Sequence, residues 1–130
     1  MIQEFVDRFM ANKQQLEAAF AKEFPSYESI VKETIRVISS GDYENPDPER
    51  IHVIDDGDYQ GTLLFVIGGH GYQPRDYWYV RVSYGSCSGC DTLDALRDLG
   101  DYDVDAPNKK QIAGIMSLAL HVVENLKAMQ

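Results

Sequence analysis

The sequence has little of what marks a secreted, membrane-spanning or disulfide-stabilised protein. Its 130 residues contain no apolar run close to the roughly 18 residues that a membrane-spanning helix needs. They also lack a charged start followed by the apolar core of a secretion signal. Two cysteines are too few for the disulfide framework of a small secreted domain. We therefore expect a soluble, cytoplasmic protein that does not act at a membrane.

Basic residues are also scarce, with 12 Lys and Arg against 21 Asp and Glu and a formal net charge of −9. The acids concentrate in residues 42–58 and 91–105, and each stretch holds a single arginine. Because binding to nucleic acid requires a basic surface that contacts phosphates, we expect no direct nucleic-acid binding. Such acidic stretches suit a basic protein partner, a surface that imitates the charge of DNA, or a solvated face that keeps the protein in solution.

What is present indicates one globular domain over residues 1–130, since 44% of the residues are hydrophobic. Hydrophobic spacing predicts seven elements in the order α-α-β-β-β-α-α: helices over 2–24 and 26–41, strands over 50–54, 62–67 and 77–84, then helices over 92–99 and from 107 onward. The connections between the strands are short, which favours an antiparallel meander over parallel crossovers. The sequence therefore predicts an α+β fold in which a three-stranded antiparallel meander packs against helices.

Two further details concern the segment before the first strand and the last helix. Residues 42–49 contain Pro46 and Pro48 among acids, so we expect a loop there. The last helix carries a continuous apolar stripe from Ile112 to Leu126, and we expect it to lie across the sheet as the main core element.

The most chemically specific motif is Cys87-Ser-Gly-Cys90, placed between the third strand and the helix that follows it. A helix N-terminus favours the thiolate form of a cysteine. In a meander, however, the end of the third strand lies beside the first hairpin, which brings Asp55, Asp56 and Asp58 near the thiols, with Asp91 adjacent, and carboxylates disfavour a thiolate. His70 is expected at the opposite end of the second strand, so a Cys–His nucleophile is not favoured.

Three interpretations of the motif stay open at this point. Both cysteines can simply shape a tight turn. They can form half of a zinc site, completed by His52 and a carboxylate or by the same pair from a second protomer. They can also form a reversible dithiol. No cofactor is predicted, and zinc is the one that this motif would take.

Tyrosines suggest a binding surface. Tyr77 and Tyr79 alternate with Trp78 and Val80, so they lie on the face of the third strand that is turned away from the core. Tyrosine is favoured in protein–protein interfaces. We therefore expect a partner-binding surface made of these tyrosines and the acids of the hairpin and the Cys-x-x-Cys turn: Asp55, Asp56, Asp58, Asp91, Tyr77 and Tyr79.

The segment Tyr84-Gly-Ser-Cys-Ser-Gly-Cys-Asp-Thr-Leu93, together with Trp78 and the helix over 118–123, resembles uncharacterised small proteins encoded by bacteriophages. This resemblance implies an accessory protein of a phage or prophage, present in the cytoplasm of the host cell. Many such proteins bind host proteins, and some are acidic inhibitors. We therefore expect a non-enzymatic protein that binds a host protein and that can also form homo-oligomers, with a zinc-binding or thiol redox domain as the alternative.

Overall fold

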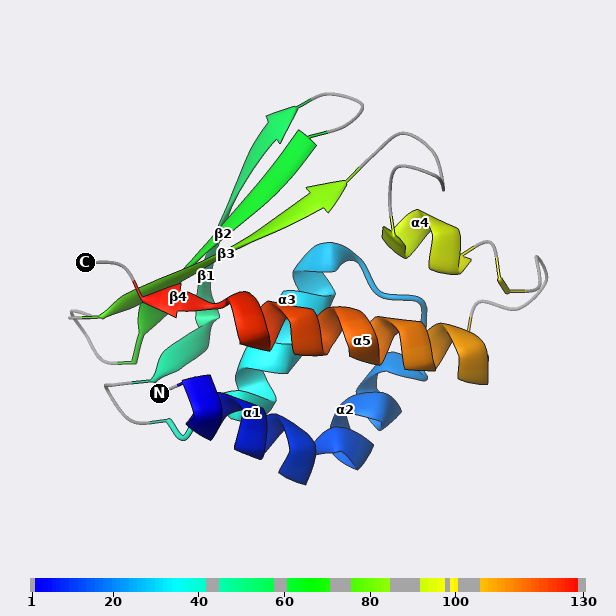
Figure 1. Cartoon of the computed structure of the whole chain (residues 1–130), viewed down its shortest axis with the longest axis horizontal. Coiled ribbons are helices and arrows are strands. Elements are labelled where there is room, and N and C mark those ends of the chain that lie inside the picture. The colour runs from blue at the N-terminus through cyan, green and yellow to red at the C-terminus, as the bar shows by residue number, and fades with distance from the viewer. Residues whose placement is uncertain are drawn as a thin grey trace.

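The computed structural model describes residues 2–41, 45–57, 61–70, 76–84, 92–97, 99–100 and 106–128. These residues form an α+β structure, as predicted, in which a sheet lies against a layer of helices (Figure 1). In chain order the elements are α1 (Ile2–Ala11), α2 (Lys13–Phe20), α3 (Tyr27–Ile38), β1 (Pro46–Gly57), β2 (Gly61–Gly69), β3 (Tyr77–Tyr84), α4 (Thr92–Arg97), α5 (Lys109–Asn125) and β4 (Lys127–Ala128). Within these residues, no helix is both long and apolar enough to cross a membrane.

The sheet is antiparallel throughout and has the order β1-β2-β3-β4. The three predicted strands pair antiparallel in chain order, with β2 between β1 and β3, but the sheet has four strands where three were expected. The fourth strand was not predicted: α5 runs directly into Lys127 and Ala128, which pair with Tyr79 and Trp78 of β3 (Figure 1). A strand of two residues carries no alternation of hydrophobicity, and so leaves no signal in the sequence.

Several predicted element bounds differ from the structure, and two of the differences are large. The single helix expected over 2–24 is two helices, and the chain leaves helical geometry at Asn12, where φ is −115° and ψ is 19°. The side-chain amide of Asn12 donates hydrogen bonds to the carbonyls of Arg8 and Val37, at 2.7 and 3.4 Å. A short polar side chain that binds backbone carbonyls in this way competes with regular helix geometry.

A loop was expected over 42–49, but β1 begins at Pro46, so residues 46–49 belong to a strand. The pairing of β1 with β2 shifts register between Pro46 and Ile51. Because β1 is an edge strand, the missing N–H groups of Pro46 and Pro48 leave the central strands intact.

The core lies between the helices and one face of the sheet. Phe65, Ile67, Trp78 and Val80 point into it from alternate positions of β2 and β3, and all are at most 2% exposed. Among the helices, α3 makes the larger contact with the sheet, along β1, while α5 meets β3 and packs against α1 and α3. The last helix does carry a buried apolar stripe, but α3 rather than α5 is the main partner of the sheet.

The short helix α4 is held on α5 by a buried glutamine. Gln111 is 4% exposed, and its side-chain nitrogen donates to the carbonyls of Leu96 and Arg97, at 3.1 and 3.3 Å. Its side-chain oxygen accepts from the backbone N–H of Asn108, which completes a capping box at the start of α5. The first turn of α5 was expected to contain Pro107; the helix instead begins at Lys109 with Asn108 as its cap.

Candidate functional site

Among the described residues, helices cover one face of the sheet and leave the other uncovered, and we call this second face the open face (Figure 1). Directly paired residues of an antiparallel sheet lie on the same face. The register therefore assigns His52, Ile54, Leu64, Val66, Tyr77, Tyr79 and Arg81 to the open face. Successive rows of this face join His52, Val66 and Tyr79, and then Ile54, Leu64 and Arg81. The prediction that Tyr77 and Tyr79 are turned away from the core is confirmed.

The centre of the open face is apolar. Ile54 is 53% exposed and Tyr77 is 41% exposed, and Leu64, Val66 and Tyr79 are each partly exposed. The guanidinium of Arg81 lies 5.9 Å from the ring centre of Tyr79, within the range of a cation–π contact. Several large apolar side chains therefore lie close together on the surface, bordered by the polar groups of His52 and Arg81.

The acids of the hairpin occupy the far end of the same strands. Asp55 is exposed and pairs with Leu63, on the face opposite to the tyrosines, while Asp56 pairs with Thr62 one row beyond Ile54 and Leu64. Rows on one face are about 6.6 Å apart, so the register places the backbone of Asp56 one row from Ile54 and Leu64. Asp58 and Asp91 lie outside the described residues.

Cys87 and Cys90 also lie outside the described residues. The register does place Tyr84, the last residue of β3, opposite Gly61, which in turn pairs with Gly57 at the end of β1. His52 is exposed and lies about 16 Å along β1 from that end, at 3.3 Å per residue. In the described part of the chain, no group of three His, Cys, Asp or Glu side chains could hold a metal ion. A zinc or redox role of the two cysteines stays a prediction, which elemental analysis and a thiol count before and after mild oxidation would test.

A polar cluster that was not predicted lies at the opposite end of the sheet, where α3, β1 and β2 meet. Ser39 Oγ lies 3.0 Å from His70 Nε2, and His70 Nδ1 lies 3.7 Å from a carboxylate oxygen of Asp47. Arg50 pairs with the same oxygen at 3.3 Å, and the N–H of Gly41 donates to Ser39 Oγ at 3.3 Å. These residues are 31 and 23 positions apart in the chain, so only folding brings them together.

Serine, histidine and aspartate in this order have the composition of a hydrolytic triad, but the local electrostatics oppose that use. Ser39 caps the C-terminal end of α3. A helix C-terminus carries partial negative charge, whereas a hydrolase needs positive dipoles at the developing oxyanion. The cluster therefore serves to tie the end of α3 to β1 and β2.

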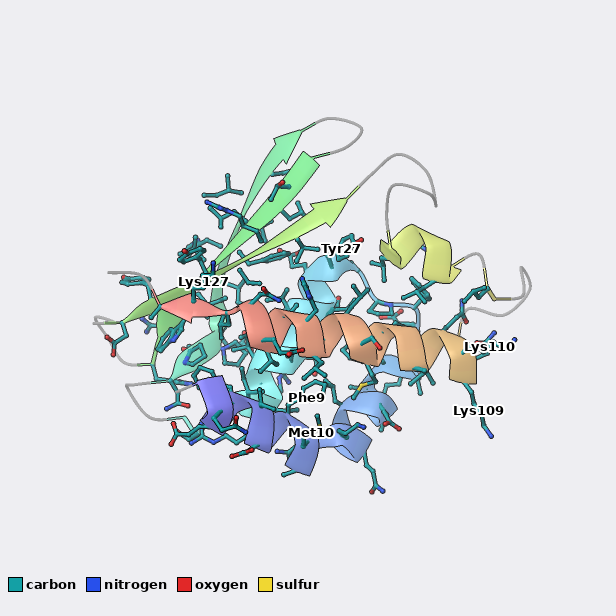
Figure 2. All side chains as sticks on the ribbon, in the orientation of Figure 1. Phe9, Met10, Tyr27, Lys109, Lys110 and Lys127 are labelled. Carbon is teal, nitrogen blue, oxygen red and sulfur yellow. The ribbon has the colours of Figure 1, made fainter. Side chains whose placement is uncertain are left out.

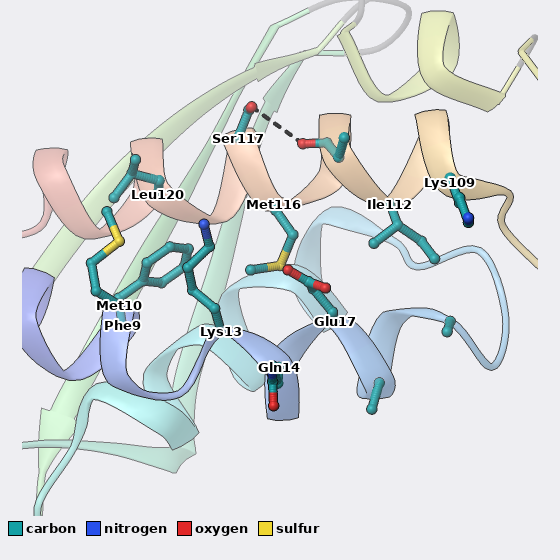
Figure 3. Close-up of a pocket in the computed structure, with 13 residues that line it drawn as sticks. Phe9, Met10, Lys13, Gln14, Glu17, Lys109, Ile112, Met116, Ser117 and Leu120 are labelled. Carbon is teal, nitrogen blue, oxygen red and sulfur yellow. Dashed lines mark hydrogen bonds between the residues drawn. The ribbon is translucent and has the colours of Figure 1, made fainter.

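A groove on the helical side is the other feature that the sequence did not reveal. It lies between α1–α2 and α5, and its volume is about 690 Å³ (Figure 3). Small side chains line it on both sides, namely Ala18 and Ala21 on the α2 side and Ala113 and Ser117 on α5. Ala and Ser leave space where larger residues would close two packed helices.

The remainder of the groove lining combines apolar groups with lysines. Ile112 and Leu120, both partly exposed, supply apolar surface together with Met10, which is 48% exposed, while Phe9 and Met116 form a buried floor. Lys13, Glu17 and Lys109 are the charged groups of the lining. Figure 3 shows Met10, Lys13 and Glu17 projecting from α1 and α2 toward α5.

Comparison with known proteins leaves these surfaces as the basis for a functional argument. No protein-family model matches the chain, and no curated protein and no solved structure matches it either. Function is therefore argued from the open face and the groove.

Proposed function

We propose that this is a non-enzymatic binding protein that recognises another protein through the open face of its sheet. The observation that supports this most strongly is the exposure of apolar residues on that face, with Ile54 at 53% and Tyr77 at 41%. Antiparallel sheets that face water normally alternate apolar residues on the core side with polar ones on the solvent side. An apolar centre bordered by polar groups is instead the anatomy of a protein–protein interface.

The charges near this face indicate what kind of partner fits. Asp55 and Asp56 stand at the hairpin end of the strands, in a chain with a net charge of −9. A basic partner would be attracted by this overall charge, which accelerates association, while an apolar patch on the partner would cover the apolar residues of the open face. The resemblance of the C-terminal part to phage-encoded proteins supports a bacterial host protein as this partner.

The test is capture of a partner from host lysate by the immobilised protein at low salt, where charge-driven association is strongest. Ile54→Asp places a charge in the centre of the open face. Leu99→Asp is its matched control, because Leu99 is 54% exposed but lies next to α4, away from the open face. We expect wild type and Leu99→Asp to capture the same protein, and Ile54→Asp to lose it.

A second variant distinguishes loss of binding from misfolding of the hairpin. Tyr77→Ser, in β3, removes an aromatic ring from the same face without adding charge next to Asp55, and it should weaken capture as well. A thermal melt of each variant shows whether it is folded. No capture by wild type at low salt would contradict the proposal, as would capture that Ile54→Asp and Tyr77→Ser leave unchanged. If no other protein is captured and the two variants lose self-association that the wild type shows, the open face would be assigned to a homo-oligomer.

A further inference from the structure

We propose that the groove between α1–α2 and α5 is a second binding site, and that it accepts an acidic amphipathic helix of a partner protein. This inference is independent of the open face, which lies on the other side of the sheet from the helices (Figure 1). Its basis is the shape of the groove, the nature of its apolar lining and the position of its lysines.

The dimensions suit a helix. The α5 residues of the lining run from Lys109 to Leu120, about 16 Å at 1.5 Å per residue, which corresponds to three turns. Small residues on both walls leave a channel into which a further helix can place its side chains. The lining also contains Met10 and Met116, and methionine adapts to differently shaped apolar faces.

The lysines give the site its preferred charge. Lys13 is the first residue of α2 and Lys109 is the first residue of α5. Cations are unfavourable at a helix N-terminus, where the backbone already carries partial positive charge, and neither helix has an acid in its first turn. Both lysines therefore stand where folding alone favours an acid. Together with one acid, Glu17, they make the groove positive within a chain of net charge −9.

The acids of the β1–β2 hairpin do not cancel this local charge. The hairpin with Asp55 and Asp56 extends away from α1 and α2, on the other side of the molecule (Figure 1). Charges separated by more than a Debye length, about 8 Å at physiological salt, are largely screened from each other. An incoming helix with acids along its flanks therefore meets Lys13 and Lys109, while its apolar stripe contacts Met10, Ile112 and Leu120.

The experiment uses lactam-bridged helical peptides of four turns, with leucines at positions i, i+3, i+4 and i+7 and either glutamates or lysines on the flanks. Binding to the full chain is measured by fluorescence anisotropy at 0.15 M salt, with a set of leucine registers for each charge type. We expect the glutamate peptides to bind at least tenfold more tightly than the lysine peptides. Met10→Glu should weaken the glutamate peptides at least tenfold.

Charge reversal provides the discriminating variant. Lys13→Glu with Lys109→Glu should reverse the preference between the two peptide types, and it should not lower the melting temperature, because acids are favoured at both helix starts. Lys127→Glu is the matched control: Lys127 is exposed in β4, at the opposite end of α5 from Lys109 (Figure 2). This control should leave peptide binding unchanged.

Three outcomes would overturn the proposal. The first is no binding of any glutamate peptide at 0.5 mM, and the second is equal binding of the two charge types. The third is that decanoate displaces the bound peptide at low concentration and itself loses affinity in the Met10→Glu variant, which would assign the groove to a small amphiphile. If the peptides bind but no protein is captured through Ile54, the groove remains a binding site and only the proposed function is contradicted.

Discussion

The two faces of the sheet are built from the same strands, but they differ in how far their apolar residues are exposed to water. On the covered face, Phe65 and Ile67 are fully buried under the helices. Their chain neighbours Leu64 and Val66 stay partly exposed, and Ile54 in the next strand is 53% exposed. Folding explains most of the covered face, because its apolar residues are largely removed from water, and among its large apolar side chains Val53 of β1 stands out at 37% exposure. Folding does not explain apolar residues on the open face, and these are the ones that a binding partner would cover.

The largest contrast is expected between two isoleucines. Ile67→Ala deletes a fully buried side chain and should lower the free energy of unfolding by about 2–5 kcal/mol. Ile54→Ala removes the same atoms from the open face and should lower it by less than about 1 kcal/mol. Urea unfolding measures both. Equal losses would show that the open face contributes to folding as the covered face does.

The next effect concerns the helical layer that distinguishes the two faces. Gln111→Ala removes two hydrogen bonds to the end of α4 and one to Asn108, and should cost about 2–3 kcal/mol at roughly 1 kcal/mol each. Gln15→Ala is the control, since Gln15 is exposed in α2. Similar urea midpoints for the two variants would mean that the bonds of Gln111 do not stabilise the layer.

A smaller effect on stability is expected from Gly114→Ala in α5, and its sign should depend on the residue at position 96. A Cβ at position 114 would lie 2.2 Å from a methyl group of Leu96, so Gly114→Ala should destabilise by about 1 kcal/mol although alanine is the better helix former. In a Leu96→Ala background the clash is gone, and the same substitution should stabilise by about 1 kcal/mol. A double-mutant cycle by thermal unfolding tests this, and additivity of the two changes would contradict it.

The smallest effect on folding is expected on the open face itself. Arg81→Ala breaks an exposed cation–π contact with Tyr79 and should change stability by about 0.5 kcal/mol or less. If the open face binds a partner, the same variant should still weaken capture from lysate, because it removes a polar group from the border of the interface. A large loss of stability would instead indicate that Arg81 belongs to the folding network.

Alternation and capping made much of this fold predictable. Trp78, Val80 and Val82 alternate with tyrosines and an arginine, and the bounds of β3 match the prediction at both ends. Ser26 caps α3 as expected, with its side chain accepting from the N–H of Ser29. Signals of this kind depend only on near neighbours in the chain, so they can be recognised from the sequence alone.

The features that were missed depend on distant residues. The break at Asn12 involves the carbonyl of Val37, 25 positions away, and β4 exists only because α5 ends beside β3. The groove likewise needs two helices whose pairing is set by the tertiary structure. For the candidate site, the sequence predicted the tyrosines, but not that Ile54 and Leu64 would share their face.

Site-specific photo-cross-linking in host cells tests the central claim most directly. A benzoylphenylalanine replaces Tyr77 on the open face in one variant and Leu99 in the other, and both positions are well exposed, at 41% and 54%. The account predicts a covalent adduct with one host protein from position 77 and none with that protein from position 99. An adduct from position 99 alone, or the same adduct from both positions, would contradict it.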